Sequence, residues 1–363
     1  MKKFAALFLA CIMAAGILAG CAGNSGSATQ QTTAAPETTV APETTAALET
    51  TTAPETTQVP EETEAEEVEQ DTSVSIKVAA MNGPTGMGMA YLNEQSDNGK
   101  TAYKYDVTYA SSPDEVTGSL IQGEIQIAAL PVNLAAVLYN KTEGNILTAA
   151  VNTLGVLYIV EKGETVNSLA DLAGKKIVAS GQGSTPEYVL DYLLEKNGLT
   201  DQVEVEYVSE HDEAVTALVS GDAQLVMIPE PKVTAALSQV EGARIAVDLT
   251  AEWDKVSDAQ LVQGVIVVQK SFAKEHADIV DKFLEEYADS VEFTNENAEE
   301  ASQIIEKYGI IPKAPVALKA LPNCNIVCLT GDEMESAVKA MWQTLYDANP
   351  QSVGGSIPEE LYK

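Results

Sequence analysis

Arginine is almost absent from this sequence, because Arg244 is the only one among 363 residues. Basic residues as a whole are scarce: 21 lysines and arginines stand against 54 aspartates and glutamates. The imbalance is not confined to one end, since residues 74–363 still hold 43 acidic and 19 basic residues. Phosphate contacts require clustered lysine and arginine. The composition therefore argues against nucleic acid as a partner and against a broad contact with anionic lipid.

Histidine and cysteine are also scarce. The two histidines, His211 and His276, lie in polar stretches that look helical, and no HExxH, CxxC or triad-like motif is present. We therefore expect no metal and no cofactor. Near the C-terminus, Cys324 and Cys328 leave two alternatives open. An extended segment would hold their Cα atoms beyond the roughly 7 Å limit for a disulfide, whereas a looped segment would allow one.

Long apolar runs are missing except at the N-terminus. Residues 4–18 form an uncharged apolar run after Lys2 and Lys3, short for a bilayer span but suited to a signal peptide. The run ends in Leu-Ala-Gly-Cys at 18–21, which resembles the bacterial lipobox. The resemblance implies cleavage after residue 20, a lipid on Cys21, and a location on the outer face of the cell membrane. An ordinary secretory signal with a chance cysteine is the alternative.

Residues 21–73 are predicted to form the lipidated cysteine and a disordered stalk. The hexapeptide APETTV at 35–40 recurs imperfectly up to residue 64, and residues 22–73 carry 11 acidic residues and no basic one. Proline favours polyproline II, and the glutamates repel one another. The segment has too few apolar side chains to offset the entropy of ordering by burial.

The remaining residues, 74–363, alternate between apolar strand-like runs and amphipathic helical stretches. Two such series, at 75–150 and 175–247, predict βα units with mainly parallel sheets. Extended segments at 154–161 and 261–269 are predicted to cross between the two series. The pattern therefore predicts an α/β fold with two lobes that face a cleft.

Several segments resemble the ABC-transporter substrate-binding proteins of the nitrate/sulfonate/taurine class, which includes thiamine-pyrimidine-like members. The segments are SLADLAGKKIVASGQGS (168–184), NGPTGMGMAYL (82–92), IQIAALPVNLAAVLYNKTEG (125–144), NTLGVLYIVEKGE (152–164) and VMIPEPKV (226–233).

The resemblance implies a two-lobed, periplasmic-binding-protein-like (type II) fold that closes on a solute and delivers it to an ABC permease and its ATPase. The expected order is a signal peptide (1–20), a lipidated stalk (21–73), the first part of lobe 1 (74–157), lobe 2 (158–262) and a helical return to lobe 1 (263–363). A monomer is expected.

Candidate ligand contacts follow from the ends of strands, where open α/β sheets place their ligands. Four strand ends carry a loop of small residues and a helix start, whose free N–H groups favour polar ligands. For most of these residues a purely structural role is an equal alternative. The candidates are Pro84, Thr85, Gly86, Met87, Pro131, Asn133, Ser184, Thr185 and Glu230, with Asn152, Thr153 and Gln263 on the crossing strands and Cys324 at one side of the cleft.

The ligand is expected to be a small organic solute that contains nitrogen or sulfur. The candidate loops lack lysine and arginine, so an anion would depend on helix N-termini and hydroxyl groups, while a neutral or cationic heterocycle fits equally well. Two other classes stay open. One is an enzyme on the same fold, like thiamine-pyrimidine synthases or menaquinone-pathway enzymes, and the other is a surface sensor or adhesin without transport.

Overall fold

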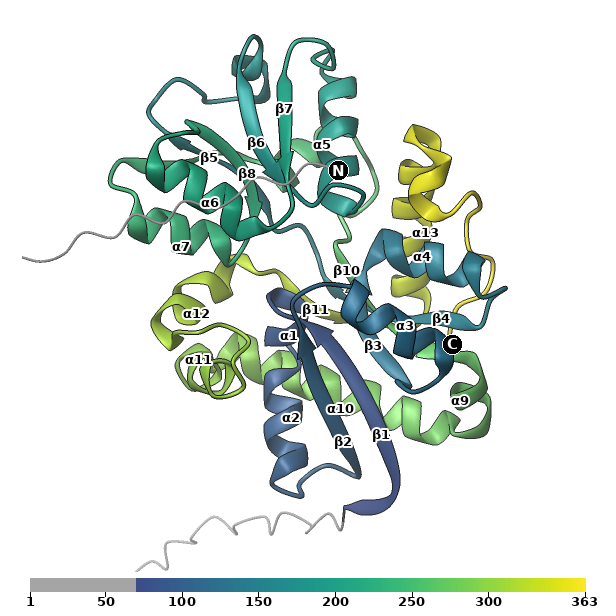
Figure 1. The fold of residues 1–363 in the computed structure, drawn as a ribbon. Coiled ribbons are helices and arrows are strands. Elements are labelled where there is room, and N and C mark those ends of the chain that lie inside the picture. Colours follow the sequence, from purple (N-terminus) through teal and green to yellow (C-terminus); the bar gives the residue numbers. More distant parts are fainter. Residues whose placement is uncertain (1–69) are drawn as a thin grey trace, which may run out of the picture. The chain divides into compact units, whose positions relative to one another are not determined.

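The computed structural model describes residues 70–363 (Figure 1). The predicted signal peptide, Cys21 and nearly all of the predicted stalk lie outside the described residues. The first strand, β1 (Asp71–Met81), begins within the last residues assigned to the stalk. The Asp71 amide anchors this start by donating to the carbonyl oxygen of Ala102 over 2.8 Å.

A mixed six-stranded sheet holds the first βα series. Its strand order is β11-β4-β10-β3-β1-β2, with β1 parallel to β2 and β3, β10 antiparallel to β3 and β4, and β11 antiparallel to β4. The further bounds are β2 (Tyr103–Ala110), β3 (Ile127–Pro131), β4 (Ile146–Thr153), β10 (Gly264–Gln269) and β11 (Ile326–Leu329).

A five-stranded sheet holds the second series. Its order is β7-β6-β8-β5-β9, where β6 is parallel to β7 and β8, and β5 is antiparallel to β8 and β9. The bounds are β5 (Leu157–Lys162), β6 (Lys176–Ser180), β7 (Glu204–Val208), β8 (Leu225–Pro229) and β9 (Ala243–Asp248). Two mixed sheets interleaved with helices confirm the predicted α/β class.

Helices connect the strands and cover the sheets (Figure 1). Those between the strands are α1 (Pro84–Met87), α2 (Ala90–Asp97), α3 (Asp114–Gln122), α4 (Val132–Lys141), η1 (Leu169–Leu172), α5 (Thr185–Lys196), α6 (His211–Ser220), α7 (Lys232–Gln239) and α8 (Leu249–Trp253). The C-terminal set is α9 (Lys270–Glu275), α10 (Ala277–Glu296), α11 (Ala298–Lys307), α12 (Ala314–Ala320), η2 (Leu321–Asn323), α13 (Gly331–Ala348) and η3 (Pro350–Val353).

Both faces of the first sheet are buried, as the apolar character of its strands requires. In β1, Ile76, Val78 and Ala80 point into one core, while Ala79 and Met81 point into the other. Successive side chains of a strand alternate between faces, so a strand apolar on both sides needs cover on both. The helices α2, α10 and α11 supply part of the first core, and α4 and α13 supply part of the second.

The segment from 154 to 161, predicted as one strand that crosses between the lobes, is interrupted. Strand β4 ends at Thr153 in the first sheet, and β5 begins at Leu157 in the second. Between them lies Gly155, where a Cβ atom would lie 2.0 Å from the Thr250 hydroxyl oxygen. The close approach of α8 leaves no room for a regular strand with side chains at this point. In the part of the chain that the structure covers, none of the helices has the length and apolarity that a membrane crossing requires.

Candidate ligand-binding cleft

A cleft of about 620 Å³ is lined by the ends of strands from both sheets. The first sheet contributes the loop after β1, the end of β4 and the residues that open β10, and the second contributes the loop after β8 and the start of α6. The turn between α11 and α12 completes the wall. This volume suits a small organic molecule. The lining segments are 82–85, 210–212, 229–232, 263–264 and 309–313, with single residues that include Ser111, Pro131 and Thr153.

The glycine-rich loop after β1 forms one wall, and two of its four predicted contacts lie on the cleft. Pro84 and Thr85 line it, and the Thr85 hydroxyl donates to the Met81 carbonyl oxygen over 3.0 Å. Gly86 and Met87 are fully buried and are not among the lining residues. Gly86 instead lets α1 pack closely, since a Cβ atom there would lie 2.5 Å from the Met81 carbonyl oxygen.

The cleft lining includes two residues with a buried polar group that no other group in residues 70–363 satisfies. The Thr153 hydroxyl, at the end of β4, and the Gln263 Nε2 group, just before β10, have no hydrogen-bond partner there. Both residues line the cleft and are at least nine-tenths buried. Their backbones are paired, because the Gln263 amide donates to the Thr153 carbonyl oxygen over 2.9 Å. Leaving a buried donor unpaired is costly, so these groups point to a polar solute.

Glu230 is a buried residue of the same cleft lining. It is 1% exposed and sits between two prolines at the end of β8. Its two oxygens accept from the amide and the hydroxyl of Thr234, over 3.0 and 3.1 Å, in the first turn of α7. Burial raises its pKa above the ordinary value, and the hydrogen bonds from Thr234 oppose the rise. Glu230 therefore interacts with the N-terminus of α7, and its direct contact with a ligand stays a prediction.

Asn133, Ser184 and Thr185 lie together but do not line the cleft. The Thr185 hydroxyl donates to the Asn133 side-chain oxygen over 3.0 Å, and the Asn133 amide donates to the Gly183 carbonyl oxygen over 3.4 Å. Ser184 is the N-cap residue of α5, although its side chain makes no capping hydrogen bond. These residues thus join the start of α4 to the start of α5. Pro131, which precedes α4, does line the cleft.

Asn152 and Cys324 are buried beside the site and are not among the lining residues. The Asn152 side-chain oxygen packs against Gly264, where a Cβ atom would lie 2.5 Å away. Cys324 packs against the methionine of α1, with its sulfur 4.0 Å from the Met87 sulfur. Cys324 and Cys328 are free thiols, so no disulfide closes this segment.

Sequence reasoning missed two lining segments. The first is the start of α6, where Glu210, His211 and Asp212 line the cleft. Its signal was available, since a strand end at Val208 is followed directly by a helix, as at the four predicted loops. The second is the turn 309–313, which lies between α11 and α12. It follows a helix and not a strand, so the strand-end pattern in the sequence does not predict it.

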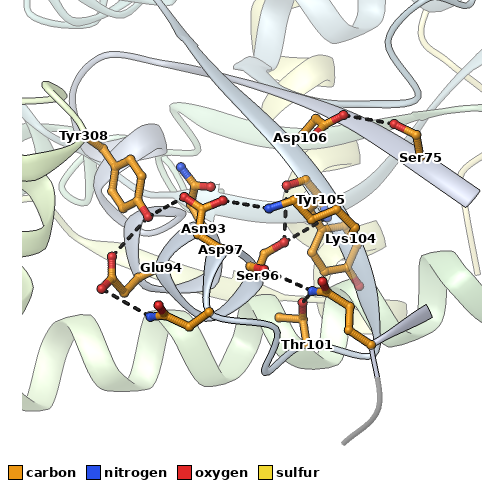
Figure 2. Close-up of polar contacts among 12 residues, drawn as sticks. Ser75, Asn93, Glu94, Ser96, Asp97, Thr101, Lys104, Tyr105, Asp106 and Tyr308 are labelled. Carbon is orange, nitrogen blue, oxygen red and sulfur yellow. Dashed lines mark hydrogen bonds and ion pairs between the residues drawn. The ribbon is translucent and has the colours of Figure 1, made fainter. Parts of the chain in front are cut away.

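A polar cluster anchors the turn 309–313 at its N-terminal end. Figure 2 shows the Tyr308 hydroxyl beside two carboxylates of α2, at 2.8 Å from Asp97 Oδ2 and 3.1 Å from Glu94 Oε2. Lys307 and Lys104 add ion pairs to Glu94 and Asp97, respectively. Burial, and then the hydrogen bonds to the carboxylates, raises the pKa of Tyr308. The cluster fixes the end of α11 against α2, and so fixes where the cleft turn begins.

Residues 144–301 match the family model described as NMT1/THI5 like. Among curated proteins, none matches the sequence. A solved structure of an ABC transporter from Parabacteroides distasonis is 25% identical, covers 79% of this chain and 98% of its own, and has a TM-score of 0.67.

Two further structures share the fold at lower identity. The periplasmic aliphatic sulphonate binding protein of Escherichia coli is 18% identical, covers 78% of this chain and 92% of its own, and has a TM-score of 0.63. The alkanesulfonate-binding protein of Xanthomonas axonopodis pv. citri, bound to MOPS, is 14% identical, covers 80% and 97%, and scores 0.61.

The predicted resemblance is confirmed. The family model agrees with the predicted resemblance over residues 144–301, and the solved structures, the two sulfonate-binding proteins among them, share the periplasmic-binding-protein-like fold. For this binding-protein fold, the lining found here is the expected one, because ligands of open α/β sheets lie beyond the carboxyl ends of strands. In residues 70–363, no group of three or more histidine, cysteine, aspartate or glutamate side chains is arranged to hold a metal ion.

His211 is expected to be neutral in the cleft at pH 7. Burial, and then the positive charge of Lys232, lowers its pKa to about 4, while Asp212 opposes the shift. Its Nδ1 lies 2.6 Å from the Ser180 hydroxyl oxygen. The ring should therefore titrate near pH 4 in an NMR pH series. Since the folded pKa lies below the unfolded value of about 6.5, this group's contribution to stability is present above pH 6.5 and is lost as the pH falls toward 4.

The chain has only two histidines, so a His211→Gln variant assigns the signals and removes this pH dependence. A ring that titrates at pH 6 or above would contradict the prediction.

Proposed function

We propose that this chain is the solute-binding lipoprotein of an ABC importer. It is anchored through Cys21 to the outer face of the membrane, and it captures a small organic solute that contains nitrogen or sulfur. The solute lies in the cleft and is passed to a membrane permease driven by its ATPase. The proposed boundaries are lobe 1 at 74–157 and 263–363, and lobe 2 at 158–262. The protein acts as a monomer and needs no cofactor.

One observation carries the proposal. The cleft is lined by strand ends of both sheets, and its lining includes Glu230 together with Thr153 and Gln263, which carry buried polar groups without a hydrogen-bond partner in residues 70–363. A site built from both sheets allows the solute to stabilise a closed arrangement, which a permease can distinguish from the open one. The sulfonate-binding proteins that share this fold support the same role.

An enzyme on this fold is the weaker alternative. Catalysis would need a nucleophile or a poised acid–base group that faces the solute. The Ser180 hydroxyl, the partner of His211, is 1% exposed and is not among the lining residues. The free Cys324 thiol is buried, and burial raises its pKa well above the ordinary value, which disfavours the thiolate.

Isothermal titration calorimetry of the full chain in detergent tests the proposal. The panel contains sulfonates, pyrimidines and amino acids, and we expect at least one to bind with 1:1 stoichiometry and without turnover. Mass spectrometry of small molecules that copurify with the chain extends the panel. Binding only of sugars or metal ions, or conversion of the bound molecule into a product, would contradict the proposal.

A further inference from the structure

The chain passes between the two sheets twice, and the shorter connection is held by a residue from outside it. Residues 154–156 join β4 to β5, whereas residues 249–263 join β9 to β10. The Leu154 amide donates to the Asn325 carbonyl oxygen over 3.0 Å, and the Asn325 side-chain amide donates to the Gly155 carbonyl oxygen. Asn325 therefore fixes two successive residues of a connection that has few dihedral angles of its own.

Gly155 is confined from the side of the second sheet as well. Thr250 lies in the first turn of α8, directly after β9, and a Cβ atom at Gly155 would lie 2.0 Å from the Thr250 hydroxyl oxygen. The glycine thus lies between Asn325, which enters β11 of the first sheet, and a helix that follows a strand of the second sheet. A change in the angle between the sheets that bends this short connection disturbs one of these contacts.

The backbone of Asn325 has an unusual conformation. Its φ is 42°, and Glu143 is the only other non-glycine residue with a positive φ in the part of the chain that the structure describes. Asparagine adopts this left-handed region more readily than most residues, which fits the residue type found here. Its neighbours hold the conformation, because Cys324 and Ile326 are buried and Ile326 pairs with Thr153 of β4. A strained residue that is fixed on both sides commonly serves a positional role.

The same short segment also contacts the second sheet at Glu230. Burial raises the pKa of the Glu230 carboxyl group, and a hydrogen bond from the Asn323 side chain is among those that oppose the rise. The helix that precedes the segment, α12, packs against α7, which begins shortly after Glu230. Segment 323–325 therefore joins the first sheet, through β11, to the connection 154–156 and to the end of β8.

Water reaches both asparagines of this segment. Asn323 and Asn325 are solvent-exposed, and neither lines the cleft. Because water replaces an exposed hydrogen bond at little cost, these contacts can open and re-form, unlike contacts in the core. The segment thus suits a reversible restraint.

We infer that residues 323–325 form a clasp between the two sheets, in which Asn325 restrains the connection 154–156 and Asn323 holds the loop after β8. The clasp limits the range of angles between the sheets and favours the arrangement in which strand ends of both line one cleft. A solute that needs this arrangement binds more weakly as the fraction of molecules in it falls. Solute affinity thus depends on residues that do not line the cleft. The inference goes beyond the proposed function, and its test needs no solute.

Distances between the two proposed lobes test the clasp, by pulsed electron spin resonance on the full chain in detergent without added solute. Spin labels are attached through non-canonical ketone side chains at exposed positions, which leaves the native cysteines intact. Gln303 on α11 and Glu195 on α5 report across the lobes, and Gln303 and Gln122 on α3 report within lobe 1. In Asn325→Gly we expect the distance distribution across the lobes to broaden about twofold and that within lobe 1 to stay unchanged.

Two further variants separate the hydrogen bond from the backbone. Asn325→Asp keeps the shape and tolerates the left-handed conformation, but its carboxylate cannot donate to the Gly155 carbonyl oxygen, so at pH 7 it should broaden the distribution as Asn325→Gly does. Glu143→Gly makes the same backbone change in the loop between α4 and β4, and should leave both distributions as in the wild type.

An unchanged distribution across the lobes in folded Asn325→Gly or Asn325→Asp, or equal broadening in Glu143→Gly, would overturn the inference. If one of the two Asn325 variants does not fold, the other decides.

Discussion

Arg244→Met is expected to lower the free energy of unfolding by about 3 kcal/mol, as removal of one partner from a buried ion pair does. The Arg244 guanidinium lies 2.7 Å from Glu161 Oε2, and it also donates to the carbonyl oxygens of Gly163 and Val166. The Glu161 side chain is 3% exposed, while that of Arg244 is 31% exposed. Methionine fills a similar volume but leaves a buried carboxylate without its countercharge. Chemical denaturation at pH 7 measures the loss.

The pH dependence gives this prediction a second check. Burial raises the pKa of Glu161, but hydrogen bonds from Thr165 and Val166 and the charge of Arg244 outweigh it, so the pKa lies below the ordinary value. The carboxylate therefore stabilises the fold above its unfolded pKa, and this contribution is lost as the pH falls through the folded pKa. The difference between Arg244→Met and the wild type should shrink accordingly in acid.

A surface lysine provides the control for Arg244. Lys176 contacts two glutamates of β7, at 3.3 and 2.6 Å, but the three side chains are at least half exposed. Lys176→Met should leave stability nearly unchanged, since exposed pairs contribute little. The double variant Glu161→Gln with Arg244→Met should recover part of the loss, because it no longer buries a charge. Equal effects of Arg244→Met and Lys176→Met would contradict this account.

The position of the only arginine explains why ligand chemistry was hard to predict from the sequence. The sequence shows directly that arginine is scarce and that the predicted loops contain no lysine. The sequence did not reveal that Arg244 is fully engaged by Glu161 and two carbonyl oxygens, because these groups lie about 80 residues away in the chain. Long-range pairing thus decides whether a charge is available to a ligand.

Much of the fold followed from local patterns. Alternating apolar runs and helical stretches predicted βα units, and the glycine-rich turn after β1 was placed correctly at a strand end. The strand order was not predictable, since β10 lies between β3 and β4 although more than 100 residues separate it from both. That order depends on which apolar faces fit together in three dimensions, which periodicity along the chain does not encode.

Some of the predicted site residues line the cleft, and others do not. Residues at strand ends, such as Thr85, Pro131 and Glu230, line the cleft, because the ends of parallel strands meet at one edge of a sheet. Gly86, one position after Thr85, and Asn152, one position before Thr153, are not among the lining residues. Successive side chains of a strand point to opposite faces, and the sequence predicts strand boundaries only approximately. His211 lies at the start of α6, after β7, which is not one of the four strand ends predicted to carry ligand contacts.

Gly86→Ala is expected to weaken both folding and solute binding, because it inserts a methyl group between the glycine-rich loop and the sheet. The new Cβ would lie 2.5 Å from the Met81 carbonyl oxygen, 3.2 Å from Tyr109 Cδ1 and 3.3 Å from Ile310 Cγ2. The nearest of these atoms belongs to the backbone, so it cannot move aside as a flexible side chain does. Overpacking of this kind costs about 1–3 kcal/mol. The measurements are the free energy of unfolding and the dissociation constant of a solute that binds the wild type.

We expect the loss of solute affinity to be larger than the loss of folding stability alone would cause. Relief of the clash moves α1 away from Met81 and Ile310, and both of these residues line the cleft. We therefore expect at least a tenfold loss of affinity in the fraction that folds, since a misplaced wall cannot form the same contacts.

Gly118→Ala is the control, because Gly118 lies within α3 and a Cβ atom there meets nothing within 4 Å. That change should stabilise the protein by about 0.5–1 kcal/mol and leave affinity unchanged. Wild-type affinity in folded Gly86→Ala would show that the loop after β1 does not set the shape of the cleft.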